Sequence, residues 1–362
     1  MLFFLDTNIF YDDWFMQAAP YRYLFHFMNN NGHSLLLSRV VLQEAAQLQS
    51  RALADELAKA QKAIAKAARL NGIAVTKEDL TFTPTQYDLL ATLAARVESV
   101  TVVDYESVSH SEMVERAIKR IRPFRENEKG YRDTLIWLSL LAYLQLRKQS
   151  GTVVFISANK SDFFNSEAKQ CEFHADLLTD LKKICPWCVQ PYASLHDFVD
   201  QTIDKNKHAI DYTKAEQAFG NYVEEEAQLF LATVSPQLIS KLEERITPGT
   251  SSLHNTKSID VDVWEGLEDF EVSSTMELGE GDVFIICLFD LRRVALIVSI
   301  PQSDYLANRS QFDIARNCFD GESHGGLFRF TSYVRPCFVV TLVYNTNDET
   351  SKDFSVSDFS FK

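Results

Sequence analysis

Four acidic residues stand where this chain could support a metal-dependent reaction. Asp6 and Asp162 come shortly after apolar runs, and Glu44 and Asp133 lie near the starts of helical stretches. Carboxylates without histidine or cysteine neighbours are typical ligands of a hard cation such as Mg²⁺ or Mn²⁺. A bound ion lowers the pKa of its water, and a second ion can stabilise the leaving oxygen of an in-line displacement. The four acids therefore indicate hydrolysis assisted by one or two ions.

Each acid also has an ordinary structural explanation. Asp6 and Asp162 can cap the helices that follow them, and the helix dipole favours Glu44 and Asp133 near helix N-termini. Asp6 is the most informative of the four, because it ends the apolar run at residues 1–5. A carboxylate at the end of a buried strand is unfavourable by several kcal/mol unless it is paired or holds a metal.

Apolar runs alternate with helical stretches through the first half of the chain. We predict strands at residues 1–5, 34–38, 152–157 and 189–192, and helices at residues 21–28, 40–69, 131–148, 177–184 and 195–203. This alternation predicts a parallel sheet with helices on both faces. Asp6 and Asp162 would lie at the carboxyl ends of its strands, where such sheets bind ligands.

The chain of 362 residues is long enough for two domains. We predict an α/β domain at residues 1–205 with a helical insertion at about residues 50–125, a helical connector at 206–250 and a β-rich domain at 251–362. In the last region, Ile259, Val261 and Val263 alternate with acidic residues, and residues 290–293 separate two apolar runs. These patterns predict an antiparallel sandwich or barrel with a hairpin at residues 290–293.

The net charge of −14 is unevenly distributed. Residues 251–362 carry 9 Lys and Arg against 18 Asp and Glu, whereas residues 115–132 carry seven basic residues against three acidic ones. Because local fields steer polyanions, the basic stretch could hold a nucleic acid by its phosphates. The candidates nearest Asp133 are Arg122, Arg125, Lys129 and Arg132, and a solvated basic face is the alternative. Tyr131 and Phe124 could stack on bases or pack in the core.

The composition is that of an ordinary soluble protein from a reducing compartment. No apolar segment is long enough to span a membrane, and no signal peptide is visible. Six cysteines are too few for a disulfide framework in a chain of this length, so we expect a cytoplasmic protein. Cys185 and Cys188 form a lone Cys-x-x-Cys pair, for which Cys171 and His174 are poorly placed partners in a zinc site.

Four motifs resemble, in order and context, those of the PIN-domain nucleases. They are Leu5-Asp6-Thr7-Asn8, Val41-Leu42-Gln43-Glu44, Gly130-Tyr131-Arg132-Asp133 and the stretch from Phe155 to Asp162. The likeness is greatest to a bacterial PIN-like group in which a long helical insertion separates the glutamate from the third acid. It covers roughly residues 1–205 and implies a Rossmann-like sheet that carries a metal-dependent ribonuclease site.

The resemblance assigns roles to individual residues. Asp6, Glu44 and Asp133 match the first three acids, and Asp162 matches the fourth, more variable one, with Asn159 as its alternative. Thr7 and Asn8 would orient Asp6. The implied cofactor is Mg²⁺ or Mn²⁺.

The implied substrate is nucleic acid, RNA rather than DNA, cleaved to a 5′-phosphate and a free 3′-hydroxyl. A DNA nuclease is one alternative, and a non-catalytic nucleic-acid-binding or signalling module is another. We expect the acidic β-rich region to bind a protein partner, form a homodimer or regulate the nuclease, because its charge disfavours nucleic acid.

Overall fold

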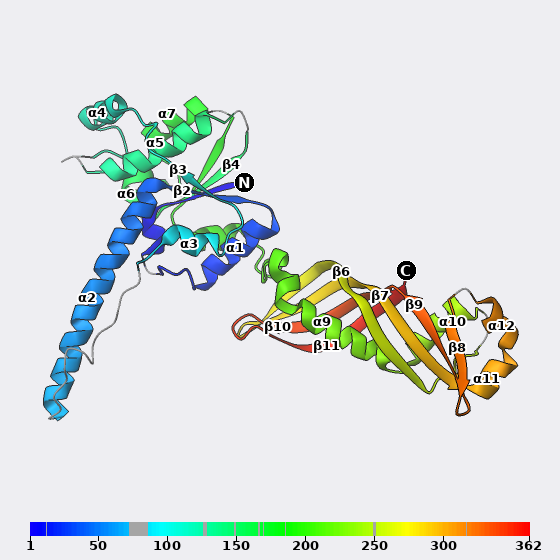
Figure 1. The fold of residues 1–362 in the computed structure, drawn as a ribbon. Coiled ribbons are helices and arrows are strands. Elements are labelled where there is room, and N and C mark those ends of the chain that lie inside the picture. Colours follow the sequence, from blue (N-terminus) through cyan, green and yellow to red (C-terminus); the bar gives the residue numbers. More distant parts are fainter. Residues whose placement is uncertain are drawn as a thin grey trace. The chain divides into compact units, whose positions relative to one another are not determined.

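Figure 1 shows the computed structural model of the protein, which describes residues 1–11, 13–71, 86–125, 129–147, 150–165, 167–168, 170–184, 186–248, 251–315 and 317–362. The chain folds as two compact units, Met1–Ile203 (unit 1) and Asp204–Lys362 (unit 2). Each unit has its own hydrophobic core. Among the helices of the described ranges, none combines the length and the apolar character that crossing a membrane requires.

Unit 1 is built on a five-stranded parallel sheet. Its strands are β1 (Leu2–Leu5), β2 (Ser34–Ser38), β3 (Val100–Val103), β4 (Thr152–Ile156) and β5 (Cys188–Tyr192), in the order β3-β2-β1-β4-β5. In the central strand β1, Phe3, Phe4 and Leu5 are fully buried, as a strand covered on both faces requires. The predicted α/β class is confirmed.

The strand order of unit 1 reverses between β1 and β4. The chain proceeds from β1 to β2 and β3 on one side and then places β4 and β5 on the other side of β1. Ligands of open α/β sheets bind at such a reversal, outside the carboxyl ends of the strands. Leu5 pairs with Ile156 in the register of β1 and β4, so the residues that follow these two strands lie next to each other at the carboxyl edge of the sheet.

Helices lie on both sides of this sheet, with α5 and α1 on opposite faces in Figure 1. The helices of unit 1 are α1 (Ala19–Asn30), α2 (Arg39–Asn71), α3 (Leu89–Ala94), α4 (His110–Lys119), α5 (Tyr131–Gln145), α6 (Lys160–Phe163), α7 (Ala175–Leu181) and α8 (Leu195–Thr202), with 3-10 turns at Thr7–Phe10 and Lys182–Ile184. α5 buries residues around much of its circumference, as a helix between layers does.

Strand β3 lies inside the region predicted as a purely helical insertion, residues 50–125, and the sequence pattern did not reveal it. It has only four residues, and of these Val103 alone is fully buried. A short strand at the edge of a sheet is half exposed, so it lacks the continuous apolar run that marks β1 and β4.

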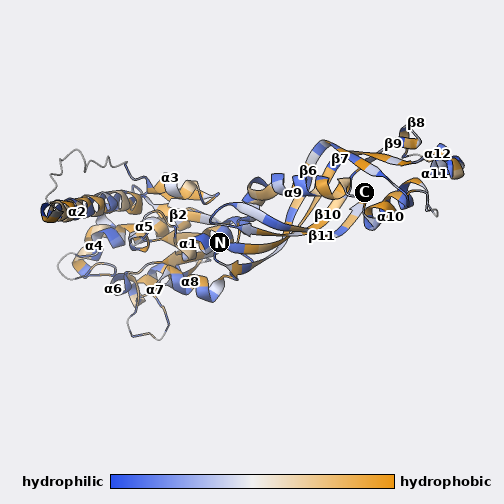
Figure 2. Ribbon diagram, turned by 90° about the horizontal axis from the view of Figure 1, so that it is seen from below, coloured by the Kyte–Doolittle hydropathy of each residue, from blue (hydrophilic) through white to orange (hydrophobic). Residues whose placement is uncertain are grey.

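Unit 2 is an antiparallel sheet packed against helices. Its strands are β6 (Ser258–Gly279), β7 (Asp282–Pro301), β8 (Phe319–His324), β9 (Leu327–Val334), β10 (Pro336–Asn345) and β11 (Thr350–Phe361), and its helices are α9 (Ala215–Ala232), α10 (Pro236–Ile246), α11 (Gln302–Ala307) and α12 (Arg309–Ile314), with a 3-10 turn at Tyr212–Lys214. β7 is central, pairing with β6 along one edge and with β10 and then β9 along the other. All the described strand pairs of unit 2 are antiparallel, which confirms the predicted antiparallel β class, and hydrophilic and hydrophobic residues alternate along the strands in Figure 2.

Residues 206–250, predicted as a connector, contribute to the core of unit 2. Phe219 of α9 packs against Phe270 and Tyr344, and Phe230 packs against Phe338. Helices rather than a second sheet therefore cover the strands, and the predicted sandwich or barrel is wrong. The apolar face of α9 in the sequence predicts that the helix packs against another element, but it does not identify that element.

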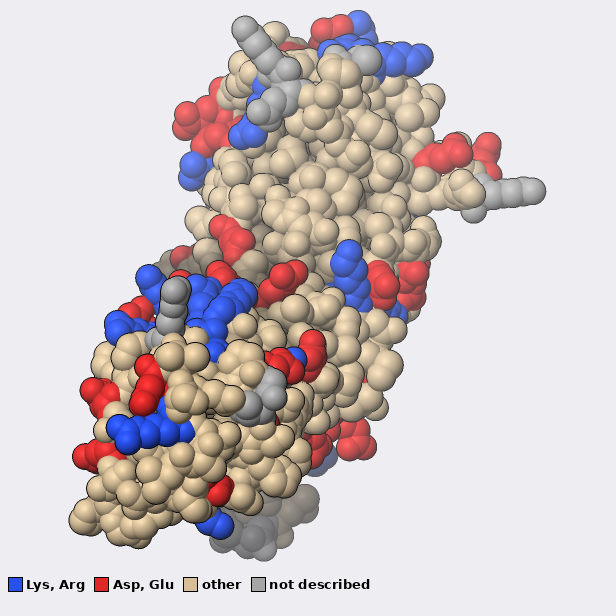
Figure 3. All heavy atoms as spheres, turned by 90° about the vertical axis from the view of Figure 1, so that its right-hand side faces the viewer, with Lys and Arg blue, Asp and Glu red and all other residues tan. Residues whose placement is uncertain are grey.

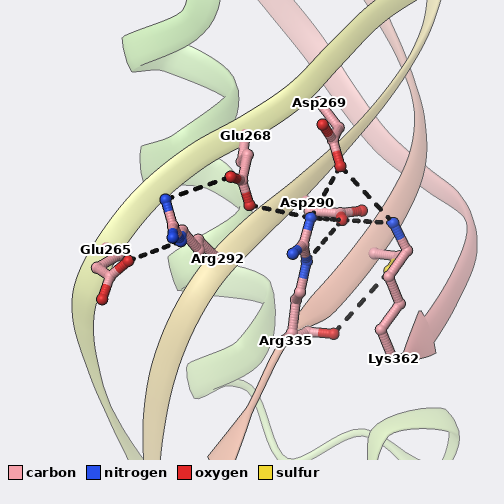
Figure 4. A network of polar contacts seen from close by, with 8 residues as sticks. Glu265, Glu268, Asp269, Asp290, Arg292, Arg335 and Lys362 are labelled. Carbon is pink, nitrogen blue, oxygen red and sulfur yellow. Dashed lines mark hydrogen bonds and ion pairs between the residues drawn. The ribbon is translucent and has the colours of Figure 1, made fainter.

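The predicted hairpin at residues 290–293 is also wrong, because β7 runs through it without a turn. Asp290 is buried and accepts hydrogen bonds from Arg335 Nε at 2.9 Å and Lys362 Nζ at 2.6 Å. Figure 4 shows this network, in which Arg335 also contacts acids of β6. The positively charged side chains of Arg335 and Lys362 stabilise this charged residue inside a long strand. The chain turns instead at residues 279–281, which have positive φ.

We expect Asp290→Asn to lower the free energy of unfolding at pH 7 by about 1–2 kcal/mol, because the buried carboxylate loses its charge-assisted hydrogen bonds from Arg335 and Lys362, which are themselves partly exposed. Burial would raise the pKa of Asp290, but hydrogen bonds from Lys362 and Arg335 outweigh it and lower the pKa. The stabilisation is therefore present above the unfolded-state pKa of about 3.9 and is lost as the pH falls through the lower, folded-state value. In urea unfolding of the whole chain, wild type and variant should converge at low pH.

Asp282→Asn is the matched control for this prediction. Asp282 begins the same strand and accepts a hydrogen bond from Lys352 Nζ at 2.8 Å, but both side chains are more exposed than Asp290. Exposed ion pairs contribute little, so this variant should unfold nearly as wild type does. If both variants lost the same free energy of unfolding, the burial of Asp290 would not be the reason why its hydrogen bonds stabilise the fold.

Candidate active site

Asp6 follows β1 and is buried, with 3 % of its surface exposed. Its backbone N–H donates to Ile156 O at 3.0 Å, which ties the end of β1 to the end of β4. Its carboxylate accepts hydrogen bonds from the Thr7 N–H at 2.7 Å, from Asn8 Nδ2 at 2.7 Å and from Ser157 Oγ at 2.6 Å. Both carboxylate oxygens are therefore held in place by fixed donors.

The acids influence one another electrostatically. The pKa of Asp6 is raised to about 7, chiefly by burial, with a lowering contribution from the Ser157 hydrogen bond and raising contributions from Asp133 and Glu44. Burial also raises the pKa of Asp133, and Asp162 and Glu44 add to this effect. Two of the four predicted acids, Asp6 and Asp162, are buried, and Glu44 and Asp133 are partly buried. Burial and like charges together raise the pKa values of Asp6 and Asp133, and a cation would offset this repulsion.

Glu44 is connected to Asp6 through Thr7. The Thr7 hydroxyl donates to Glu44 Oε2 at 2.8 Å, and Arg132 Nη1 contacts the other carboxylate oxygen of Glu44. Thr7 therefore serves two acids, Asp6 by its backbone N–H and Glu44 by its side chain. The sequence predicts only that Thr7 and Asn8 orient Asp6, so the contact of Thr7 with Glu44 is an addition from the structure.

Asn159 holds the other two acids together. Its Nδ2 donates to Asp133 Oδ1 at 2.9 Å and to Asp162 Oδ2 at 2.6 Å. Asp162 is buried and also accepts a hydrogen bond from Arg125 Nη2 at 2.8 Å. Asn159 and Asp162 were alternatives for the fourth position in the sequence, and the structure brings both to Asp133.

Gly130 permits the chain to enter α5 close to the acids. Its φ is +92°, and a Cβ atom at this position would lie 2.1 Å from the Pro123 carbonyl oxygen. Its own carbonyl accepts the first hydrogen bond of the helix, from the Thr134 N–H at 2.9 Å. Any side chain here would shift the first turn of α5, which carries Arg132 and Asp133.

The predicted phosphate-binding residues do not form one continuous free surface. Arg125 contacts Asp162, and Arg132 contacts Glu44. The guanidinium of Arg122 donates to Ser161 O at 2.8 Å. Lys129 is exposed. On the face drawn in Figure 3, basic side chains are interspersed with acidic ones.

The donor set suits a hard cation but is not gathered around one. All four candidates are carboxylates, with no imidazole or thiolate among them, which suits Mg²⁺ or Mn²⁺. Within the described ranges, however, no three Asp, Glu, His or Cys side chains are grouped so that they could hold one metal ion. Two of the acids are instead neutralised by arginines, Glu44 by Arg132 and Asp162 by Arg125.

Sequence reasoning missed Ser157 as a member of this site, and it missed Tyr11, whose pKa the acids influence. Ser157 is buried, donates to Asp6 and accepts from the Asn159 N–H at 3.1 Å. It directly follows β4 as Asp6 follows β1, so strand-end position was the signal that could have identified it. Tyr11, which no sequence motif marked, is influenced by the same charges, because burial, Glu44 and Asp6 raise its pKa to about 12.

Two other features lie apart from the acids. Cys171, Cys188, Cys287, Cys318 and Cys337 are free thiols, and Cys185 of the Cys-x-x-Cys pair lies outside the described residues. A cavity of about 880 Å³ opens between Lys160 and the end of β5, but none of the four acids lines it. Size alone therefore does not make it the reaction site.

Comparison with known proteins adds one positive finding. A family model described as a PIN domain matches residues 3–163, a range that contains all four acids. No curated protein and no solved structure matches the chain.

Proposed function

Because residues 3–163 belong to the PIN-domain family, we propose that this protein is a metal-dependent endonuclease that cleaves RNA. PIN domains are generally nucleases. The observation that carries the proposal is the buried Asp6 at the reversal of strand order, whose pKa is raised to about 7 by burial and by the charges of Asp133 and Glu44. Perturbed carboxylates at the ligand-binding end of an α/β sheet are characteristic of catalytic sites.

Asp6, Glu44, Asp133 and Asp162 would hold one or two Mg²⁺ or Mn²⁺ ions. When bound, such ions supply a water of lowered pKa and stabilise the charge of the leaving oxygen. Ser157 and Asn8 fix the direction of the Asp6 carboxylate, and Asn159 fixes those of Asp133 and Asp162. Such supporting hydrogen bonds set the geometry of metal ligands.

Arg125 and Arg132 would exchange partners when substrate binds. Each now neutralises an acid, and Arg132 keeps 66 % of its side chain exposed. With a cation on the acids, their guanidinium groups become available to the phosphates of the strand, together with Lys129 and Arg122. The products would be a 5′-phosphate and a 3′-hydroxyl.

For unit 2 we propose association with protein, either a partner or a second copy of this chain. Its residues 251–362 carry 9 Lys and Arg against 18 Asp and Glu, which disfavours nucleic acid. Trp264, Met276 and Leu278 each expose about half of their surface (50 %, 48 % and 53 %), which suits a protein interface. A reducing, cytoplasmic compartment remains our expectation from the cysteine content.

The decisive experiment is digestion of 5′-labelled RNA and DNA of the same unstructured sequence by the whole protein, with Mn²⁺ and with EDTA. We expect Mn²⁺-dependent internal cleavage of RNA to products with a 5′-phosphate at the new end. Faster cleavage of DNA would make the protein a deoxyribonuclease. Binding of both strands without cleavage at any Mn²⁺ concentration would contradict catalysis and favour a non-catalytic module.

A further inference from the structure

A cavity of about 420 Å³ opens beside Glu44, between α2 and the start of α5. Its lining includes Gln47 and Arg51 from α2, Tyr131 and Arg132 from α5, and Tyr105. Small-molecule sites typically measure about 300–1,000 Å³. We propose that this cavity binds one nucleotide of a single-stranded substrate next to the acids. The inference rests on the proposed function, because it takes the strand bound here to be the strand that is cleaved.

The aromatic residues of the cavity are suited to stacking on a base. Tyr131 is 52 % exposed, and its ring meets Phe124 edge-on, with 6.2 Å between ring centroids and 71° between ring planes. Phe124 itself is buried, so it anchors Tyr131 from the core side. Tyr105 is half-buried in the same lining. Proteins bind single strands by stacking unpaired bases on such rings.

The cavity also holds a guanidinium without a partner. Arg51 is exposed and, within the described part of the chain, takes part in no hydrogen bond or ion pair. Arg132 lies in the same lining, where it contacts Glu44. Arg51 is thus available to a phosphate beside a bound nucleoside, and Arg132 would join it once a cation on the acids releases it from Glu44.

The long helix α2 supplies one wall of this cavity. Gln43, Gln47 and Arg51 follow at intervals of four residues, so they share one face of the helix. Carboxamides such as those of Gln43 and Gln47 can pair with the edges of bases. A base can enter only when it is unstacked and unpaired, so this wall would select single strands over duplexes.

The test measures binding of a fluorescein-labelled single strand of about ten nucleotides to the whole protein in EDTA, where no cleavage occurs. We expect Tyr131→Ala to weaken binding on the order of tenfold and Tyr131→Phe to leave it near wild type, because the ring does the stacking. Arg51→Gln should weaken binding and reduce the slope of log affinity against log salt by about one. Arg69→Gln removes the same charge at the far end of α2 and should change neither value.

Each outcome bears on the proposal. Wild-type affinity in both Tyr131→Ala and Arg51→Gln, or equal binding of the matched duplex, would overturn it. Because Arg51 is exposed and unpaired, its variant should fold, so the test holds even if Tyr131→Ala does not. Normal cleavage with no effect of either variant would refute the cavity alone. Binding with the expected pattern, but without Mn²⁺-dependent cleavage, would refute the proposed function alone.

Discussion

Asp133→Asn is expected to reduce Mn²⁺-dependent cleavage by about 10³-fold, on the order of 4 kcal/mol of barrier, while the protein stays folded. Asp133 lies in the first turn of α5, where Asn159 Nδ2 donates to it at 2.9 Å. Asparagine keeps a carbonyl oxygen for this hydrogen bond but removes the negative charge that a metal ion needs. The loss should therefore appear in single-turnover cleavage and in Mn²⁺ affinity.

The folded state of this variant should be slightly more stable than wild type in EDTA. Burial, Asp162 and Glu44 raise the pKa of Asp133, so its ionised form is disfavoured in the folded protein. A neutral side chain removes that unfavourable charge. In thermal unfolding, the variant should therefore have a higher Tm than wild type in EDTA and a lower Tm than wild type in Mn²⁺, because only wild type should be fully stabilised by the ion.

Asp88→Asn is the matched control for Asp133→Asn. Asp88 also stands at a helix start, where its side chain accepts a hydrogen bond from the Ala91 N–H at 2.9 Å, and it is exposed. Asparagine is an equally good cap, so this variant should cleave as wild type does. Wild-type cleavage by Asp133→Asn itself would show that Asp133 is a helix-start residue and that the assignment of the site is wrong.

A fragment of residues 1–207 is expected to bind Mn²⁺ and to retain cleavage, whereas residues 208–362 should do neither. All four acids and the five parallel strands lie in unit 1, which has its own core. The buried residues of α9 belong to the core of unit 2, so the cut divides the chain between two cores. Calorimetric titration of both fragments with Mn²⁺ measures the expected difference.

The remaining outcomes of the fragment experiment are equally informative. Metal binding confined to residues 208–362 would move the chemistry away from Asp6 and overturn the proposed function. Cleavage that is faster in the fragment than in the whole protein would indicate that unit 2 restrains the nuclease. Loss of solubility in the fragment would call for a co-expression of the two parts, with the titration repeated on the reconstituted protein.

Local pattern was enough to predict most of the elements that carry the candidate site. The apolar residues before Asp6 and those before Ser157 form buried parallel strands, because a strand covered on both faces must be apolar throughout. Polar residues at the ends of such strands gather at one edge of the sheet. For that reason the sequence alone predicted that Asp6 and Asp162 lie at the same edge of the sheet, whereas Glu44 and Asp133, which lie in α2 and α5, needed the resemblance to join them.

The same local reasoning failed where burial was partial or was compensated from a distance. β3 is a half-exposed edge strand of four residues, so its pattern resembles a loop. Asp290 stands inside the long strand β7 because Arg335 and Lys362, far along the chain, neutralise it. A charged residue in an apolar run suggests a turn until its partners are known.

Sequence by itself determined the α/β class of unit 1 and the antiparallel class of unit 2, and it proposed the four acids of unit 1 as a candidate site. Only the tertiary structure decided which groups those acids contact. The pairing of Leu5 with Ile156 brings Ser157 to Asp6, and the position of α5 brings Arg132 to Glu44. Periodicity reports how each element is buried, whereas a side chain's partner depends on strand register and helix placement, which are fixed by packing across the whole unit.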